Sequence, residues 1–124
     1  MDKIKAVNFV RSFFEVLKSE KSVTLKKDYD VSLEQLQEIK ETVSECGMSL
    51  SDLRIVSDEE VLLQTTYGRD VFDIFQYDGS QQEVFGIETI LYSESGETDL
   101  TLLGDITVVG DDRFIFVYKL IEVK

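Results

Sequence analysis

The feature that most constrains the fold is the last third of the chain. It contains three long apolar segments, 83–93, 98–109 and 113–123. The residues between them, 94–97 and 110–112, contain glycine together with turn-forming polar residues. Long apolar segments joined by such short turns predict a meander of antiparallel strands.

Alternation of side chains indicates how this meander is covered. In 98–109 the odd positions are mostly polar, and the even positions carry the apolar residues Leu100, Leu102, Ile106 and Val108. Neighbouring side chains of a strand point to opposite faces of the sheet. We therefore expect one face of this strand to meet a core and the other to be largely wet.

The last segment, 113–123, is apolar on both faces. One face is expected to carry Phe114, Phe116, Tyr118 and Leu120, and the other Ile115, Val117, Ile121 and Val123. A strand of this kind is usually central in a sheet and covered twice. The alternative is that its second face is an interface. We expect this segment to be a central strand that is covered on both faces.

The N-terminal half predicts two amphipathic helices. Residues 2–19 have apolar residues at a spacing of three to four, and their broad aromatic stripe suits the hollow of a curved sheet. A second helix over 33–46 is expected to start at a capping box of Ser32 and Gln35 and to end at Gly47. Cys46, on the inner stripe of that helix, is expected to be a small core residue.

Shorter apolar stretches between the helices and the meander predict further strands. These are 53–56, 61–67 and 71–77, and Asp78-Gly79 is a strong signal for a hairpin turn after the last of them. The expected fold is therefore α+β, with two N-terminal helices on one side of a curved antiparallel sheet of five or six strands. At 124 residues the chain is expected to form one domain, 1–124.

The cysteine content and the N-terminal pattern suggest a compartment. Cys46 is the single cysteine and cannot form an internal disulfide, which favours a reducing environment. The N-terminal stretch is amphipathic rather than continuously apolar, so it is typical of neither a signal peptide nor a membrane span. We expect a cytoplasmic protein.

The chain is strongly acidic, and the charge is unevenly placed. The net charge is −12, with a balance of +4 over residues 1–27 and −16 over residues 28–124. An acidic protein repels nucleic acid, anionic lipid and nucleotide phosphates, and it attracts basic proteins. We expect no nucleic acid or membrane partner. The alternative explanation is that the acidity only maintains solubility.

The residue types present leave little room for catalysis. There is no histidine, the one cysteine is an expected core residue, and no glycine-rich phosphate loop occurs. A calcium loop starting at Asp28 is excluded, because its sixth and twelfth positions are Leu33 and Ile39. We expect no metal, no cofactor and no enzymatic activity. The carboxylates set among apolar strand residues, Asp73, Glu88 and Asp105, are expected to be solvated, to protect sheet edges or to contact a partner rather than to act as acid and base.

Two resemblances add to these expectations. The aromatic-rich helix at 2–19 followed by a long-stranded meander resembles the cystatin-like and nuclear-transport-factor-like α+β folds, in which a helix packs in the concave face of a curved sheet. Enzymes of that kind often place His or Asp in the cone, and this chain has no His.

The second resemblance is to bacterial immunity proteins. A small acidic chain without catalytic residues, with strand segments such as 98–102 and 114–118, is similar to the immunity proteins of contact-dependent growth inhibition and related toxin systems. The resemblance implies tight binding to one toxin domain, often a nuclease whose basic cleft is covered by an acidic surface.

The leading expectation is thus an immunity or inhibitor protein that binds a basic toxin domain. The expected contact residues are the carboxylates of the strand-and-turn region: Asp70, Asp73, Asp78, Glu83, Glu88, Glu94, Glu97 and Asp99. One alternative is a small-molecule-binding or weakly catalytic cone, with Asp73 pointing into a pocket lined by Phe9, Phe13, Phe114, Phe116 and Tyr118. Another is a homodimeric scaffold with the doubly apolar last strand at the interface; monomer and homodimer both stay open.

Overall fold

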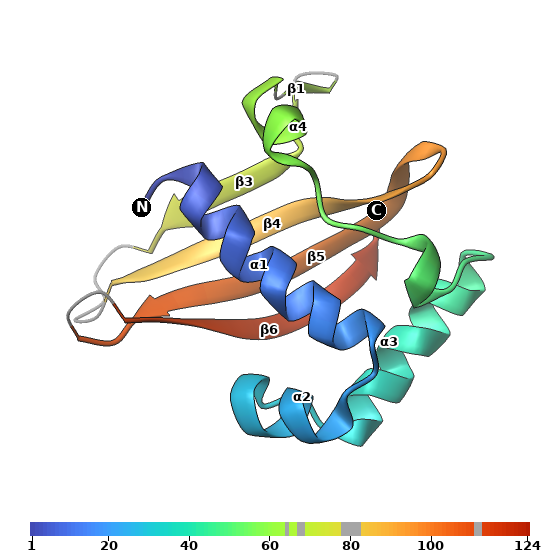
Figure 1. The fold of residues 1–124 in the computed structure, drawn as a ribbon. Helices are drawn as coiled ribbons and strands as arrows, with labels where there is room; N and C mark the ends of the chain where they lie inside the picture. Colours follow the sequence, from blue (N-terminus) through green and yellow to red (C-terminus); the bar gives the residue numbers. More distant parts are fainter. Residues whose placement is uncertain (64, 67–68, 78–82, 111–112) are drawn as a thin grey trace.

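The C-terminal half of the chain forms an antiparallel sheet, and the N-terminal half forms helices that lie on one of its faces (Figure 1). The computed structural model describes residues 1–63, 65–66, 69–77, 83–110 and 113–124. The helices are α1 (Lys3–Lys18), α2 (Ser22–Tyr29), α3 (Leu33–Glu45), the 3-10 helix η1 (Leu50–Asp52) and α4 (Asp58–Leu63). The strands are β1 (Thr65–Thr66), β2 (Arg69–Asp70), β3 (Phe72–Gln76), β4 (Val84–Ser93), β5 (Gly96–Val108) and β6 (Phe114–Val123).

The predicted meander is confirmed. The main sheet has four strands in the order β3-β4-β5-β6, and every neighbouring pair is antiparallel. The three long apolar segments of the sequence are β4, β5 and β6. The expected turn at Asp78-Gly79 lies outside the described residues, as does 111–112.

The expectation of five or six strands in one sheet is not met by the described residues. The stretch 53–56 makes only an isolated bridge, between Arg54 and Tyr92. Much of the stretch 61–67 is not a strand, because α4 extends to Leu63 and the two-residue β1 then pairs with β2 in a separate sheet. The alternation of apolar residues in this stretch was therefore misleading.

The reason for the helix at 58–63 is a capping box that the sequence reading missed. The Ser57 N–H donates to Glu60 Oε1 at 2.8 Å, and the Glu60 N–H donates to Ser57 Oγ at 3.2 Å. This reciprocal pair satisfies two backbone donors at the start of α4. The pattern Ser-x-x-Glu is present in the sequence at Ser57 and Glu60.

Glu60 also forms a two-pronged ion pair with Arg54, at 2.6 and 3.0 Å. The Arg54 guanidinium lies over the Tyr92 ring, 5.0 Å from its centroid. Hydrogen bonds from Arg54 and Ser57 hold the pKa of Glu60 down at about 2. The ion pair thus joins α4 to Arg54, whose backbone forms the isolated bridge with Tyr92 of β4.

Exchanging Glu60 for glutamine removes this ion pair and should lower the free energy of unfolding at neutral pH by about 1 kcal/mol. The expected loss is small because the pair is partly exposed to solvent. The folded-state pKa of Glu60 lies below its ordinary value of 4.5. The stabilisation is therefore present above that value and is lost as the pH falls toward 2. Thermal unfolding of both proteins across this range should show a difference that shrinks with acidification, and a pH-independent difference would contradict the assignment.

The helix α2 was not predicted. Leu25 is its one buried residue, so the sequence shows no apolar stripe there. The helix ends at Asp30, whose backbone is left-handed with φ 54°, and the following Val31 N–H donates to the Leu25 carbonyl oxygen at 3.0 Å. Packing of Leu25 into the core, rather than helical periodicity, determines this element.

The described residues form four α-helices rather than the two expected, and α1 and α3 correspond to the helices expected at 2–19 and 33–46. The side chain of Asp2 caps α1 by accepting a hydrogen bond from the Lys5 N–H at 3.0 Å. Ser32 and Gln35 form the expected capping box of α3. The helix closes at Gly47, which has φ 77° and is followed by a Met48 N–H that donates to the Val43 carbonyl oxygen. Cys46 is half-buried and packs at the margin of the core.

The core lies between α1 and the sheet. α1 crosses the sheet diagonally (Figure 1) and buries a complete apolar stripe, Ala6, Val7, Val10, Phe13, Phe14 and Leu17. The sheet contributes Leu102 and Ile106 from β5, as the even-position pattern predicted, and Phe116 from β6.

Candidate functional site: the open face of the sheet

Most of one face of the main sheet is not covered by the described helices (Figure 1), although Ile90 and Thr101 at one end of this face are buried. Its side chains come from register-paired positions on all four strands and from Tyr77, which directly follows β3. We call this the open face; it comprises Asp73, Phe75, Tyr77, Val84, Gly86, Glu88, Leu103, Asp105, Thr107, Ile115, Val117, Lys119 and Leu120. Five of these large apolar or aromatic side chains are 38–45% exposed: Phe75, Tyr77, Ile115, Val117 and Leu120. A contiguous apolar surface of this kind is typical of an interaction site.

A β-bulge in β6 decides which of its residues reach the open face. Leu103 pairs with Leu120 but Gly104 pairs with Tyr118, so Lys119 is an extra residue opposite β5. One extra residue reverses the alternation beyond it. Leu120 is consequently 45% exposed and Ile121 is 4% exposed. The prediction that placed Leu120 with Phe116 and Ile121 with Val117 was wrong for this reason.

The position of β6 also differs from the expectation. It is an edge strand rather than a central one, and its second face is exposed rather than covered. The bulge and the lysine at that bulge discourage the addition of another strand along this edge. The exposed apolar surface of β6 is therefore its side-chain face rather than its backbone edge.

A polar cluster lies in the middle of the open face. Tyr77 Oη donates to Asp105 Oδ1 at 3.1 Å, and Lys119 Nζ lies 3.1 Å from Tyr77 Oη and 3.1 Å from Asp105 Oδ2. These three side chains come from three different strand segments. Hydrogen bonds to Tyr77 and Asp105 raise the pKa of Lys119 above its usual value, so its amine stays protonated at neutral pH. A protonated amine has no free electron pair, so it does not act as a nucleophile.

Two glycines allow aromatic rings to lie close against the sheet backbone, one on each face. A Cβ at Gly86 would meet the Phe75 ring at 2.3 Å on the open face. A Cβ at Gly104 would meet the Phe116 ring at 2.5 Å and the backbone oxygen of Val117 at 2.8 Å on the core face. These rings occupy the space that a larger residue would fill.

The Gly104→Ala variant should lose about 1–3 kcal/mol of unfolding free energy, because the buried Phe116 ring and a backbone oxygen cannot easily move away. The matched Gly86→Ala variant should lose less than half as much, since the exposed Phe75 ring is free to rotate. Urea unfolding of the two variants tests this. Equal losses would show that both rings are held with the same rigidity.

The eight carboxylates predicted as a contact surface do not form one cluster. Asp73 and Glu88 face each other across β3 and β4 on the open face. Asp70 instead pairs with Lys3 at 3.4 Å. Glu94, Glu97 and Asp99 lie at the β4–β5 hairpin, whereas Glu83 lies at the other end of β4, which at its ten residues is about 30 Å long. Asp78 lies outside the described residues.

Sequence reasoning missed the apolar part of the site and the role of Asp105. The signal for the apolar part was present in the doubly apolar segment 113–123, but we favoured a covered position for it. Asp105 was noted as a carboxylate on an apolar strand and not assigned to the contact set. Its side chain is only 17% exposed because Tyr77 and Lys119 lie over it.

The pocket expected under α1 is filled by the residues that were expected to line it. The Phe13 ring lies 4.9 Å from Phe116 and 5.8 Å from Tyr118, and Phe9 lies 5.4 Å from Phe114, measured between ring centroids. Burial raises the pKa of Tyr118 to about 12. Asp73 lies on the opposite face of the sheet, so the expectation that it points into this region was wrong.

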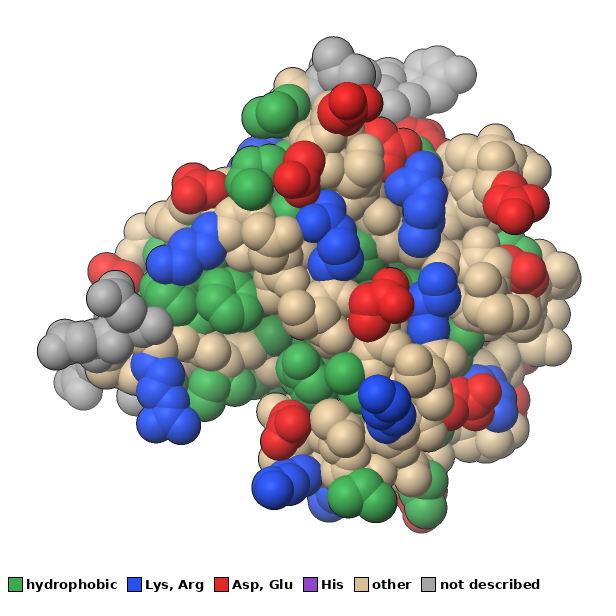
Figure 2. Space-filling model, viewed as in Figure 1, with side chains coloured by type: hydrophobic (Ala, Val, Ile, Leu, Met, Phe, Trp, Pro, Cys, Tyr) green, Lys and Arg blue, Asp and Glu red, His purple; other side chains and the backbone are tan. Residues whose placement is uncertain are grey.

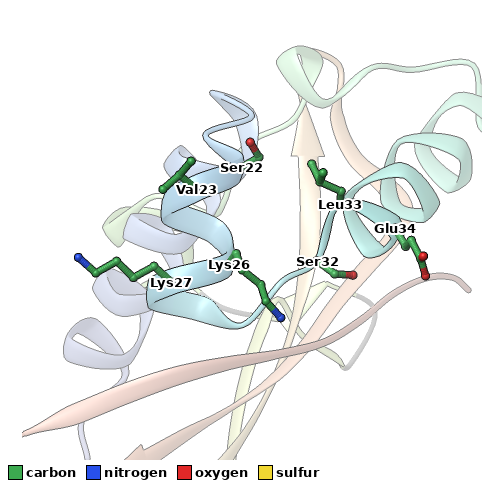
Figure 3. A pocket seen from close by; sticks show the side chains of 7 residues that line it. All are labelled: Ser22, Val23, Lys26, Lys27, Ser32, Leu33 and Glu34. Carbon is green, nitrogen blue, oxygen red and sulfur yellow. The ribbon is translucent and has the colours of Figure 1, made fainter.

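A surface hollow lies between α2 and the start of α3 (Figure 3). It has a volume of about 610 Å³ and is lined by Ser22, Val23, Lys26, Lys27, Ser32, Leu33 and Glu34. Val23 and Leu33 are 78% and 70% exposed, and Lys26 pairs with Asp30 at 3.3 Å. In Figure 3 the side chains of Lys27 and Glu34 point away from each other. Ligand sites instead have convergent polar groups, so we do not assign this hollow as a site.

The charge asymmetry of the sequence is partly neutralised within the fold. The basic N-terminal segment pairs with the acidic remainder, through Lys3 with Asp70 and through Arg11 with Asp58 at 3.1 Å. The helix-covered side shows both charges interspersed (Figure 2). The helix-covered side is therefore not divided into a basic and an acidic region (Figure 2).

The described side chains contain no group of three or more His, Cys, Asp or Glu placed to hold a metal ion. Within the same described part of the chain, every helix is too short or too polar to cross a bilayer. Comparisons of the chain with protein-family models, with curated proteins and with solved structures found no significant match.

Proposed function

We propose that this chain is an immunity or inhibitor protein that binds and neutralises a basic toxin domain, such as a nuclease, through the open face. The observation that supports this most directly is the set of exposed apolar side chains on a sheet whose other face is already filled. A second apolar face has no role in holding this chain together. It suits a surface that becomes buried in a complex.

The composition of the open face matches the centre of a protein interface. Aromatic residues such as Phe75 and Tyr77 supply large contact area, and such residues dominate binding energy. The Lys119–Asp105 pair lies among them and already has its hydrogen bonds. A partner that covers this ion pair removes water from it. Because the two charges already neutralise each other, the pair can fix the orientation of the partner without leaving an unpaired buried charge.

The acidic residues have a different role in this proposal from the one first expected. The hairpin carboxylates Glu94, Glu97 and Asp99 lie beyond the open face and act over a distance, through the net charge of −12. Charge of this kind accelerates the encounter with a basic protein, by about 10–1000-fold at low salt. Association should therefore slow as salt rises, while dissociation depends on the open face.

A homodimeric scaffold is the second candidate, since the exposed face of β6 is the same surface that a dimer would bury. Light scattering at micromolar concentration separates the two proposals. A stable dimer that is lost on substitution of Val117 favours the scaffold. A monomer favours the inhibitor.

The test of the inhibitor uses three baits in lysates of the source organism and its close competitors. One bait is the unaltered chain and the second carries Phe75→Ser and Val117→Ser on the open face. The third carries Val23→Ser and Leu33→Ser, which removes two apolar side chains that are even more exposed but lie at α2 and α3. Any protein retained by the first and third baits but not by the second is purified and assayed for toxic activity with and without this chain.

The proposal expects a basic protein whose activity is suppressed at a one-to-one ratio. Retention by all three baits would place the contact elsewhere on the molecule. If the retained protein keeps its full activity in the presence of this chain, the chain binds that protein but does not inhibit it.

A further inference from the structure

The carboxylates of the open face are unequally neutralised. Asp105 has Lys119 as its counterion, and Glu88 pairs with Lys124, which reaches the face from the end of β6. Asp73 has no Lys or Arg within ion-pair distance among the side chains that the structure describes. Within the described part of the chain, Asp73 is thus the carboxylate of the open face that lacks a counterion.

Asp73 also lies in an unfavourable position for the isolated protein. It is the direct cross-strand partner of Glu88, and like charges at such positions destabilise a sheet. Phe75 lies next to the pair on β3, and Leu103 faces Glu88 from β5. A local rule broken on an otherwise regular, exposed face is typical of a residue retained for function.

Lys124 is a replaceable counterion for this pair. It follows the last residue pair of the sheet, Leu100 with Val123, and its ammonium group also lies 3.8 Å from Glu122. Its side chain is 37% exposed and long, so holding it in one place costs side-chain entropy. A cation supplied from outside competes with it at Glu88.

We propose that the open face takes a cationic segment of a protein partner, in which an arginine or lysine flanked by apolar side chains binds Asp73 and Glu88 and displaces Lys124. This proposal rests on the proposed function and specifies its contact. A guanidinium group can bridge two carboxylates, and the flanking apolar side chains would cover Phe75 and Leu103. A second copy of this chain fits poorly, since it brings an identical carboxylate pair.

The experiment titrates the ¹⁵N-labelled chain with tetra-arginine amide at low salt and follows the backbone amides by NMR. Three variants are compared with the unaltered chain: Lys124→Gln, Lys40→Gln and Asp73→Asn. Lys40 is the matched control because it forms an ion pair of the same kind with Glu20, at 2.8 Å on the helix side, and its loss changes the net charge equally.

We expect the backbone amide resonances of Asp73 and Glu88 to change their chemical shifts and to reach saturation as peptide is added. Binding there should be about two- to fivefold tighter in Lys124→Gln than in Lys40→Gln, which corresponds to the strength of one exposed ion pair. It should be about threefold weaker in Asp73→Asn. Equal affinities in the two lysine variants, or shifts spread evenly over the carboxylates of α3, would overturn the proposal.

The two proposals can fail separately. The peptide titration contains no partner protein, so a negative titration leaves the bait experiment to decide whether the open face binds a toxin. A positive titration with no toxin found in the bait experiment would support the cation-binding contact and remove the inhibitory function.

Discussion

The Phe13→Ala variant is expected to lose about 3–5 kcal/mol of unfolding free energy, the range found for truncating a buried phenylalanine. Phe13 is completely buried. Its ring lies between the helices and the sheet. The distances between ring centroids are 5.1 Å to Tyr29, 4.9 Å to Phe116 and 5.8 Å to Tyr118. Removing it leaves three aromatic rings around a cavity that they cannot fill without moving the backbone.

Urea unfolding followed by circular dichroism measures this loss. The matched control is Phe75→Ala, which removes the same ring from the open face, where it is 43% exposed. That variant should lose less than about 1 kcal/mol, as surface substitutions usually do. Equal losses in the two variants would mean that the open face is covered in solution, and this would contradict the central structural observation.

The same Phe75→Ala variant should have its large effect on binding. Once a partner is identified, we expect its affinity for the variant to fall by at least about 30-fold, which corresponds to the roughly 2 kcal/mol of a binding hot spot. The Phe75 ring lies close over Gly86, beside the Tyr77–Asp105–Lys119 cluster. A phenylalanine side chain has only two torsion angles to fix on binding, so most of its contact energy is retained.

Isothermal titration calorimetry measures the affinity, and Val23→Ala provides the control, since Val23 is more exposed but lies at α2. The control should change the affinity by less than about threefold. A partner that distinguishes the two variants by less than a factor of two would exclude the open face as the contact surface. Together the two Phe variants separate stability from binding: one ring holds the fold and the other is available to a partner.

The exposed apolar strands of the open face raise the risk of aggregation, and two features of the sheet edges reduce this risk. Exposed apolar strands invite aggregation through their unpaired backbone groups. Here the edge strand β3 has only five residues, and the other edge strand, β6, is interrupted by a bulge at Lys119. Both features disfavour edge-to-edge pairing while leaving the side-chain face accessible. This arrangement suits a protein that binds a partner through side chains rather than by adding a strand.

The sequence by itself determined the parts of the fold that depend on local patterns. The meander followed from long apolar segments separated by short turns, and α1 and α3 followed from helical periodicity with caps at Ser32 and Gly47. These signals involve neighbouring residues, so they are readable without a structure. The Ser57–Glu60 capping box of α4 was equally local and should have been recognised.

Only the tertiary structure decided which face of the sheet is covered and which carboxylates share a surface. The apolar alternation of β6 is the same whether a helix or a partner covers its second face. The bulge at Lys119 exchanges Leu120 and Ile121 between the faces because a single extra residue reverses the period of two. Asp73 and Glu88 meet only because β3 and β4 pair in one register, fifteen residues apart along the chain. Burial and register are properties of long-range packing, and a local pattern does not contain them.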